Sequence, residues 1–319
     1  MALFALAFAN GANDVGKSVA SLMVGPSGPS PRRRPLLWGG AFSGIGSVTA
    51  ILISGRLFSV FTPQSILRTA FNSEFVLAIL VGATIWVLLA TLLRLPVSTT
   101  HAILGATVVQ GLFLFGLSGL NWDFLALRVL LPMAGGPLAA LIGVYLFERL
   151  RRGRKVQDRG VSRWAGLSHW GSAAATAFAR GVNDAPKIAV LGVFFLSAYS
   201  SGAIQISYLI VALAVFVGSL VLGHRVAVTL SGRTVPLDHA QRLRAGVATA
   251  ALVSAGAYLG APLSMTHVHE GATAGESGLK ETINSALRSM VLPWLVTLPV
   301  AGLLAAGLSI FGPTILSLV

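Results

Sequence analysis

The stretch "FANGANDVGK" (Phe8–Lys17) recurs in the second part of the chain as "FARGVNDAPK" (Phe178–Lys187). Six of the ten positions are identical, among them an Asn-Asp pair at Asn13–Asp14 and again at Asn183–Asp184. Both pairs lie in strongly apolar parts of the sequence, where polar groups are costly and are functional candidates by default. The repetition indicates that two parts of the chain contribute equivalent residues to one site.

A second motif is repeated in the same order. "PVSTTHAILGAT" at 96–107 and "PLSMTHVHEGAT" at 262–273 share seven of twelve positions. The Asp of the first motif and the His of the second are 87 positions apart in one copy and 83 in the other. The chain is therefore predicted to be a tandem duplication, with a first repeat at 1–150, a basic linker at 151–164 and a second repeat at 165–319.

The composition is that of a membrane protein. The 319 residues are 55% hydrophobic and only 10% charged, against about 25% charged residues in soluble domains. Apolar runs such as "FVLAILVGATIWVLLATLL" approach the ~20 residues that a helix needs to cross a bilayer, and they do not alternate as barrel strands do. We therefore predict an all-α integral membrane protein. Because cysteine is absent, disulfide and thiol chemistry are excluded.

Ten crossings of the cell membrane are predicted, five in each repeat. They are 3–25, 36–54, 75–93, 96–116 and 128–148, and then 168–196, 205–223, 245–261, 262–278 and 288–310. The segments that carry the motifs are short, polar and interrupted by Gly or Pro, so we expect broken or re-entrant helices there. An even number of crossings places both termini on one side, which we predict to be the outside.

Basic residues in the loops predict the orientation. The formal net charge is +13, and the linker 149–163 holds seven Lys or Arg, which places it in the cytoplasm by the positive-inside rule. The loop with Arg32–Arg34 is basic, whereas its counterpart at 197–203 carries no charge. This bias changes sides between the halves, which predicts two repeats of inverted topology. No segment could build the soluble basic face that nucleic-acid binding needs.

The second motif has the residues of a helix start, with Pro where a helix begins and hydroxyls that can satisfy free N–H groups. One interpretation is plain helix capping. In the other, two broken helices that start at mid-membrane direct their free N–H groups and positive dipole ends at a bound anion. The hydroxyls that would join this anion cradle are those of Ser98, Thr99, Thr100, Ser264 and Thr266.

The two Asn-Asp pairs add carboxylates beside the anion cradle. Asp14 and Asp184 could simply pair with the lysines three positions further along each helix. Alternatively, they bind a coupling cation such as Na⁺, or they accept the proton that phosphate retains at neutral pH and sulfate lacks. The candidates for binding a coupling cation are Asp14, Asp184, Asn13 and Asn183.

Further polar residues are candidates for modulating the site: Lys17, Lys187, His101, His267 and Glu270. The two histidines follow the hydroxyls in both repeats, where they either hold the broken helix by a hydrogen bond or take part in proton coupling. No metal site is predicted beyond a bound Na⁺, because "HVHE" places His267 and His269 on different faces of a helix.

The four motif blocks together resemble one known family. "GANDVGK" with "PVSTTHAILGA", repeated as "GVNDAPK" with "PLSMTHVHEGA", is similar to the PiT inorganic phosphate transporters over nearly the whole chain. The resemblance implies helices in inverted repeats, phosphate uptake coupled to Na⁺ or H⁺, and a homodimer. It also implies substrate binding by Asn13, Asp14, Ser98, Thr99, Thr100, Asn183, Asp184, Ser264 and Thr266.

The sequence departs from the family pattern at a few positions. The first motif usually continues "ANA", but here it continues "GKS", which puts Lys17 near the site. Met265 stands where a second hydroxyl is expected, and Glu270 and Glu276 add carboxylates to the same segment. These departures leave both Na⁺ and H⁺ open as the coupling ion.

The sequence thus predicts a secondary active transporter that takes up inorganic phosphate with Na⁺ or H⁺, by alternating access at a midplane site built from both repeats. Such a protein is not an enzyme and uses no cofactor, and its partners are phosphate, the lipid bilayer and a second copy of the chain. One alternative is a transporter of another oxyanion such as sulfate. Another is a membrane enzyme acting on phosphate groups, which would need a nucleophile–base pair that the duplicated motifs do not supply.

Overall fold

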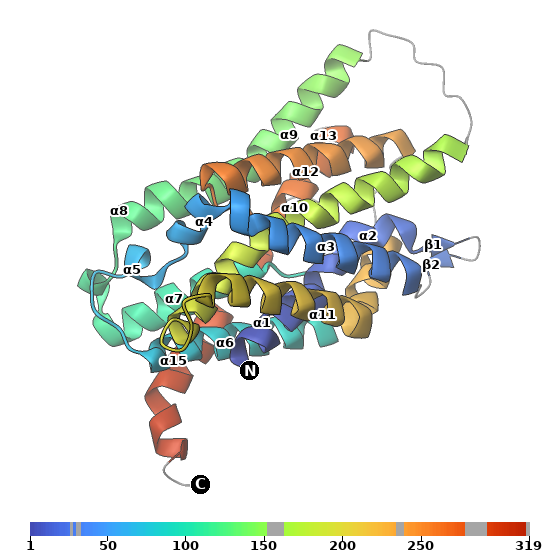
Figure 1. Cartoon of the computed structure of the whole chain (residues 1–319). Helices are drawn as coiled ribbons and strands as arrows, with labels where there is room; N and C mark the ends of the chain where they lie inside the picture. Colours follow the sequence, from blue (N-terminus) through green and yellow to red (C-terminus); the bar gives the residue numbers. More distant parts are fainter. Residues whose placement is uncertain (26–27, 30–32, 152–162, 234–238, 278–291, 317–319) are drawn as a thin grey trace.

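The structure is a computed structural model that describes residues 1–25, 28–29, 33–151, 163–233, 239–277 and 292–316. These residues form helices joined by short connections, with one hairpin of two short strands (Figure 1). The all-helical architecture confirms the predicted all-α class, while the inverted topology of the two repeats stays a prediction. Most of the predicted basic linker, residues 152–162, lies outside the described residues.

Most of the described elements precede the predicted linker. The first half carries α1 (Ala2–Asn10), the π-helix η1 (Gly11–Val15), α2 (Gly16–Val19), the 3-10 helix η2 (Ala20–Leu22), β1 (Val24–Gly25), β2 (Gly28–Pro29), α3 (Arg33–Ile53), α4 (Gly55–Val60), α5 (Pro63–Ile66), α6 (Ser73–Leu92), α7 (Thr99–Phe115), the 3-10 helix η3 (Leu117–Gly119), α8 (Trp122–Phe124), the π-helix η4 (Leu125–Leu130) and α9 (Leu131–Arg151). The second carries α10 (Arg163–Leu196), α11 (Ala203–Arg233), α12 (His239–Leu259), α13 (Met265–Ser277) and α15 (Leu292–Leu316).

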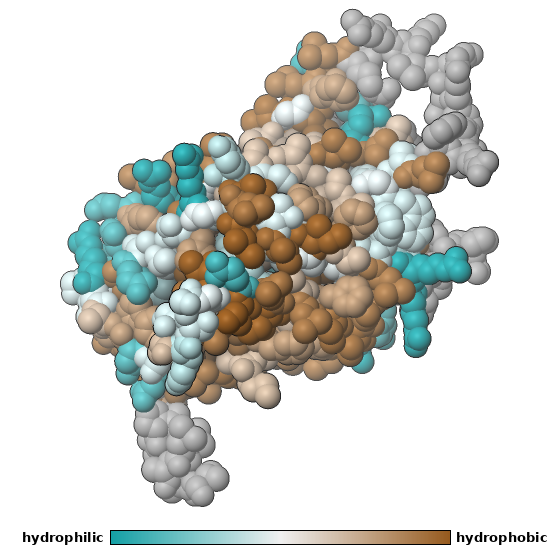
Figure 2. Space-filling view, in the orientation of Figure 1, coloured by the Kyte–Doolittle hydropathy of each residue, from teal (hydrophilic) through white to brown (hydrophobic). Residues whose placement is uncertain are grey.

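Four helices in the described part of the chain are long and apolar enough to cross a membrane: Arg33–Ile53, Ser73–Leu92, Trp122–Leu150 and Ala203–Ser231. Two shorter apolar helices, Thr99–Phe115 and Leu295–Phe311, accompany them. On the face shown in Figure 2, hydrophobic residues gather over the middle of the molecule and hydrophilic ones lie mostly toward its two ends. The number of ten crossings stays a prediction, because only these four described helices are long and apolar enough to cross a membrane.

The two halves of the chain are interleaved. α10 of the second half packs on α3 of the first, while α11 of the second packs on α1 and η1 of the first. The later helices also pack on helices of the opposite half: α7 packs on α15, and α13 packs on α9. Each pairing joins an element of one half to an element of the other, so the core is shared between the halves.

Repeated glycines lie where these helices cross. A Cβ added to Gly11 would collide with the backbone of Val215 in α11, and one added to the matching Gly181 would collide with the backbone of Ser43 in α3. The glycines of the second motif pack against α15 and α9 in the same way. Small residues let helix backbones approach closely in membranes, which explains why both copies of each motif keep them.

The helix interruptions lie just before α7 and α13. Residues 95–98 and 261–264 are not helical, and α7 then begins after Ser98, whose hydroxyl accepts the main-chain N–H of His101 at 3.4 Å. Pro96 and Pro262 disfavour helix at the residue before them, and the following serine is a good N-cap. These two short helices therefore start inside the protein, as the second motif predicts.

The expected break at the second Asn-Asp pair is wrong. α10 runs without interruption from Arg163 to Leu196, although it contains Pro186. A proline removes the N–H that would bond the carbonyl four residues earlier. That carbonyl belongs to Val182, and it accepts instead a hydrogen bond of 3.0 Å from the buried hydroxyl of Ser54. In the first half the motif stays helical as well, but it forms the π-helix η1, a form frequent at functional sites.

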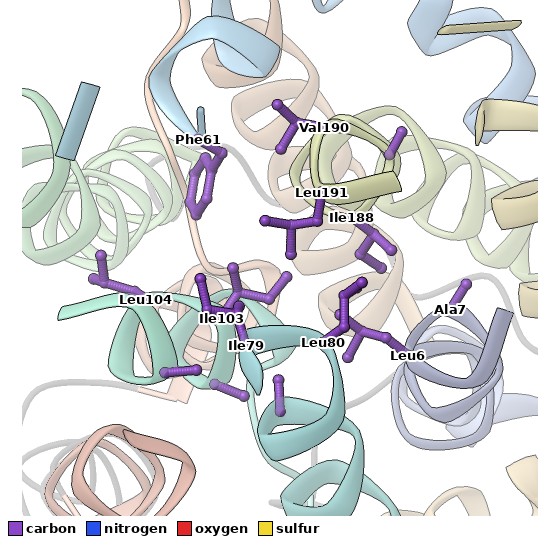
Figure 3. Packing of buried hydrophobic residues seen from close by; sticks show 14 of the residues in the cluster. Leu6, Ala7, Phe61, Ile79, Leu80, Ile103, Leu104, Ile188, Val190 and Leu191 are labelled. Atoms are coloured by element: carbon purple, nitrogen blue, oxygen red, sulfur yellow. The ribbon is translucent and has the colours of Figure 1, made fainter. Parts of the chain in front are cut away.

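A buried apolar core joins helices of both halves. Figure 3 shows Leu6 of α1, Leu80 of α6, Ile103 of α7 and Leu191 of α10 converging on one another. All four side chains are at most 2% exposed. This core thus joins α1 and α10, which carry the two copies of the first motif, to α7, which carries the first copy of the second motif.

Candidate functional site

The two copies of the first motif meet in the interior. Asp14 on η1 and Asp184 on α10 share two partners, Arg180 and Asn10. The guanidinium of Arg180 lies 3.3 Å from Asp14 Oδ1 and 3.9 Å from Asp184 Oδ2. The amide of Asn10 donates to Asp14 Oδ2 at 2.7 Å and to Asp184 Oδ2 at 3.4 Å. The two predicted carboxylates therefore belong to one cluster.

Sequence reasoning missed both of these shared partners. Asn10 and Arg180 occupy the same position in the two copies of the motif, and identity between the copies does not mark them because the residues differ there. An arginine within an apolar span was the signal that could have found the second of them, since such a residue almost always faces the interior and pairs. Arg180 is 2% exposed, and its Nε also donates to Ser18 Oγ at 3.1 Å.

One neutral partner of each carboxylate differs between the halves. Asp14 Oδ2 accepts the hydroxyl of Thr99 at 2.9 Å. The residue that matches Thr99 is Met265, which has no hydroxyl to donate. Asp184 Oδ1 accepts instead from the side-chain amide of Asn183 at 2.8 Å. The lost hydroxyl in the second half is thus replaced by an amide from the neighbouring residue.

The two lysines are held by matching sets of oxygen atoms. Lys17 Nζ donates to Asp14 Oδ1 and to the main-chain carbonyl of Val97, and it lies 3.0 Å from Thr266 Oγ1. Lys187 Nζ lies 3.4 Å from Asp184 Oδ1, 3.0 Å from the carbonyl of Leu263 and 2.8 Å from Thr100 Oγ1. Val97 and Leu263 match in the second motif, as do Thr100 and Thr266. Each lysine therefore binds its own half through a carboxylate and a carbonyl, and the opposite half through a threonine.

The two asparagines of the Asn-Asp pairs hold the non-helical segments. Asn13 Nδ2 donates to Thr91 Oγ1 at 2.9 Å and to the carbonyl of Leu95 at 3.0 Å, while its Oδ1 accepts the N–H of Val97 at 3.1 Å. Asn183 Nδ2 donates to the carbonyl of Leu263 at 3.1 Å. Both side chains thus satisfy backbone groups that the interruptions before α7 and α13 leave without helical partners.

The two copies of the second motif face each other. The hydroxyl of Ser264 donates to that of Ser98 at 3.1 Å, and the rings of His101 and His267 have centroids 4.8 Å apart. His267 Nδ1 lies 2.6 Å from Ser264 Oγ, within the first turn of α13. The N-terminal ends of α7 and α13, with their free N–H groups, are therefore close together, as an anion cradle requires.

The cluster is closed to solvent and carries a net positive charge. Its members with at most 9% exposure are Asn10, Asn13, Asp14, Lys17, Ser98, Thr99, Thr100, His101, Arg180, Asn183, Asp184, Lys187, Ser264 and His267. Thr266 is half-buried. Two lysines, one arginine and two aspartates give the cluster a formal net charge of +1. Buried charges are normally paired with opposite charges, and each of these has such a partner. The arrangement suits the binding of an anion by hydroxyls, cations and helix ends.

Two further carboxylates, those of Glu270 and Glu276, lie on α13, the helix that begins in the second copy of the second motif. Glu270 is half-buried, and Glu276 forms a bidentate ion pair with Arg244 of α12 at 2.8–2.9 Å. His269 Nδ1 lies 3.3 Å from Thr249 Oγ1. The described residues contain no group of three or more His, Cys, Asp or Glu side chains placed to hold a metal ion.

Comparisons with known proteins agree on one family. Residues 10–305 match the model of the phosphate transporter family. A "Probable low-affinity inorganic phosphate transporter" of Mycobacterium bovis is 31% identical over 316 residues, covering 94% of this chain and 73% of the relative. The protein of the same description from Mycobacterium leprae is 29% identical over 315 residues, with the same coverage. A solved structure described as "The sodium-dependent phosphate transporter" has the same fold, with a TM-score of 0.81 at 19% identity over 100% of this chain and 98% of the other.

Proposed function

The chain belongs to the phosphate transporter family, and from this premise we propose that the buried cluster is the site at which it binds phosphate during transport. Membership makes the chain a multi-pass membrane protein that transports inorganic phosphate and is not an enzyme. The observation that carries the proposed site is the matched pair of lysines, each bound to the carboxylate and carbonyl of its own half and to a threonine of the other.

The proposed substrate ligands come from both halves. The hydroxyls of Ser98, Thr100, Ser264 and Thr266 and the free N–H groups at the starts of α7 and α13 supply hydrogen-bond donors. The guanidinium of Arg180 adds a planar donor that matches phosphate geometry. Thr99 donates to Asp14 in this structure, so we propose that it orients the carboxylate as much as it contacts the substrate.

We assign a positioning role to Asn13 and Asn183 within this site. Their amides bond the segments before α7 and α13, which supports a role in fixing where these helices begin. Asp14 and Asp184 are then the groups that interact with a coupling cation or accept the proton of phosphate. Sulfate offers no such proton at neutral pH, which supports phosphate as the preferred oxyanion.

Alternating access through two inverted repeats, 1–150 and 165–319, is the proposed mechanism. The reciprocal packing of α10 on α3 and of α11 on α1 supports it, because rocking one set of helices against the other would expose a shared central site to either side.

The proposed assembly is a homodimer. The proposed orientation has the linker 149–163 in the cytoplasm and both termini outside; cysteines introduced at Arg154 and Ser200 of this cysteine-free chain should then react from opposite sides. Labelling of both from one side would contradict inverted repeats.

The proposed driving force is a cation gradient, of either Na⁺ or H⁺. The solved relative in fold is described as sodium-dependent, which supports Na⁺ as one candidate. Carboxylates that could exchange a proton with the substrate support H⁺ as the other. Radiolabelled phosphate uptake into proteoliposomes, with Na⁺ and pH gradients set independently, tests the function and identifies the ion.

A matched pair of arginine variants tests the assignment of the site. Arg180→Ala removes a buried guanidinium that bonds both aspartates and should abolish phosphate uptake. Arg68→Ala removes an exposed arginine that also pairs with an aspartate, Asp123 at 3.4 Å, and should leave uptake unchanged. Equal uptake by the two variants would contradict the site, and no uptake by the wild type under any gradient would contradict the function.

A further inference from the structure

The two lysines are held in a way that an ordinary ion pair does not require. An aspartate three positions earlier on the same helix is enough to pair a lysine. Here each ammonium also reaches a main-chain carbonyl about 80 positions away along the chain and a threonine hydroxyl of the opposite half. The arrangement occurs twice, at matching positions of both motifs, so it is not the accident of one side chain.

The atoms around each ammonium are those that bind a hard cation. Lys17 and Lys187 each face one carboxylate, one main-chain carbonyl and one hydroxyl, so every hydrogen-bond partner is an oxygen. Lys187 Nζ also lies 5.7 Å from the centroid of the Phe61 ring. Carboxylates and the carbonyls of unwound segments are the ligands that transporters use for Na⁺. The carbonyls here belong to Val97 and Leu263 in the two non-helical segments, where no helix uses them.

We propose that Lys17 and Lys187 are tethered cations that take the places a bound Na⁺ would occupy, so that phosphate transport by this chain does not require Na⁺. A sodium ion that entered either oxygen shell would lie within a few ångströms of the ammonium already there, and like charges repel strongly where water is excluded. Lys17 is 9% exposed and Lys187 is 1% exposed, so neither ammonium can withdraw into water without a rearrangement. Of the two candidate coupling ions, the proton remains.

The charge of the cluster is consistent with this role. The two lysines and Arg180 already exceed the two aspartates by one positive charge. A site that contained aspartates without these lysines would need added cations before it could accept an anion. The chain itself supplies the positive charge here, and it carries that charge through every transport cycle because the lysines stay attached.

The first test uses the wild-type protein and rests on the proposed function. Phosphate uptake into proteoliposomes is measured under a fixed pH gradient, with external Na⁺ or with choline at equal ionic strength. We expect equal rates in the two salts. A fall of about tenfold or more on replacing Na⁺ by choline would overturn the tethered-cation proposal while leaving phosphate transport intact.

The second test removes an ammonium and looks for the cation site that it leaves. Lys17→Ala and Lys187→Ala keep the surrounding carboxylate, carbonyl and threonine, so Na⁺ should bind in place of the lysine. Uptake by each variant should rise by about tenfold when choline is replaced by Na⁺. Lys155→Ala, a lysine of the predicted linker outside the repeated motifs, is the matched control and should show no response to Na⁺.

A binding measurement makes the outcome independent of transport. Na⁺ should raise the Tm of the purified Lys17→Ala and Lys187→Ala variants relative to choline, because a ligand that binds the folded state stabilises it, and it should not raise the Tm of the wild type. Stabilisation of the wild type by Na⁺, or variants that respond to Na⁺ in neither assay, would overturn the proposal. If neither variant folds, the two wild-type measurements decide. Absence of phosphate uptake under every gradient would instead contradict the proposed function.

Discussion

Replacing Ser54 by Ala should destabilise the protein through a single backbone carbonyl. The hydroxyl of Ser54 donates at 3.0 Å to the carbonyl of Val182, whose usual helical partner is missing because residue 186 is a proline. Ser54 and Val182 are both 0% exposed, so water cannot take over the hydrogen bond. An unsatisfied buried group costs about 1–3 kcal/mol, and hydrogen-bond cycles within membranes give at most about 1.7 kcal/mol.

We therefore expect Ser54→Ala to lower the free energy of unfolding by about 1–1.5 kcal/mol. Removal of one oxygen atom leaves little cavity, so packing should add little to this value. Unfolding by sodium dodecyl sulfate in mixed micelles, followed by circular dichroism, measures the change. Ser59→Ala is the matched control, because its hydroxyl donates to the Gly55 carbonyl on an exposed surface of α4 and should change stability by less than about 0.5 kcal/mol.

The double variant isolates the cause. Pro186→Ala restores an N–H that can bond the carbonyl of Val182 within α10, so Ser54→Ala should cost less than half as much in that background as in the wild type. An equal cost of Ser54→Ala in both backgrounds would refute the reasoning, because the effect would then not depend on the missing N–H.

The charged groups and the substrate allow three more tests. Asp14→Asn and Asp184→Asn should each reduce phosphate uptake severely while the protein still inserts into the membrane. The loss of uptake should be larger for Asp14→Asn, because two cations contact Asp14 within 3.3 Å. Wild-type uptake by the Asp184→Asn variant would contradict a site built from both halves. Phosphate should be preferred over sulfate by roughly 10⁴-fold at neutral pH if a carboxylate accepts the phosphate proton, and comparable uptake of the two anions would rule this out. Arg244→Ala removes the guanidinium shared by the buried Glu148 and Glu276, so the free energy of unfolding should fall by about 3–5 kcal/mol; a loss below about 1 kcal/mol would show that the carboxylates do not need it.

Local signals predicted where the short inner helices begin. The second motif combines a proline, which disfavours helix before it, with a serine, which caps the helix after it. α7 begins at Thr99 and α13 at Met265, each directly after that serine. Both signals act within a few residues, so they can be interpreted without knowledge of the rest of the fold.

The path of the chain through the second Asn-Asp pair could not be predicted in this way. Whether Pro186 breaks α10 depends on a hydroxyl from Ser54, 128 positions away along the chain. The roles of Asn13 and Asn183 depend in the same manner on backbone groups about 80 positions distant. Duplication in the sequence therefore marked the identical residues that lie together in the buried cluster, but it did not mark Asn10 and Arg180, nor which residues bond the backbone. That this cluster binds the substrate stays a prediction.

Arg180 and Asn10 illustrate a further limit of comparing two copies of a motif. Residues that are identical in the two copies mark what each half contributes to the site. The two copies of one position can, however, meet at the centre of the site. Two identical residues would be unfavourable there. Two arginines in these places would bring two guanidinium groups together, whereas two asparagines would leave the carboxylates with less positive charge. One arginine and one asparagine let both side chains reach both aspartates, with the guanidinium 3.3 Å and 3.9 Å from them and the amide 2.7 Å and 3.4 Å from them. In a site assembled from a duplication, a polar position at which the copies differ is therefore as informative as one at which they agree.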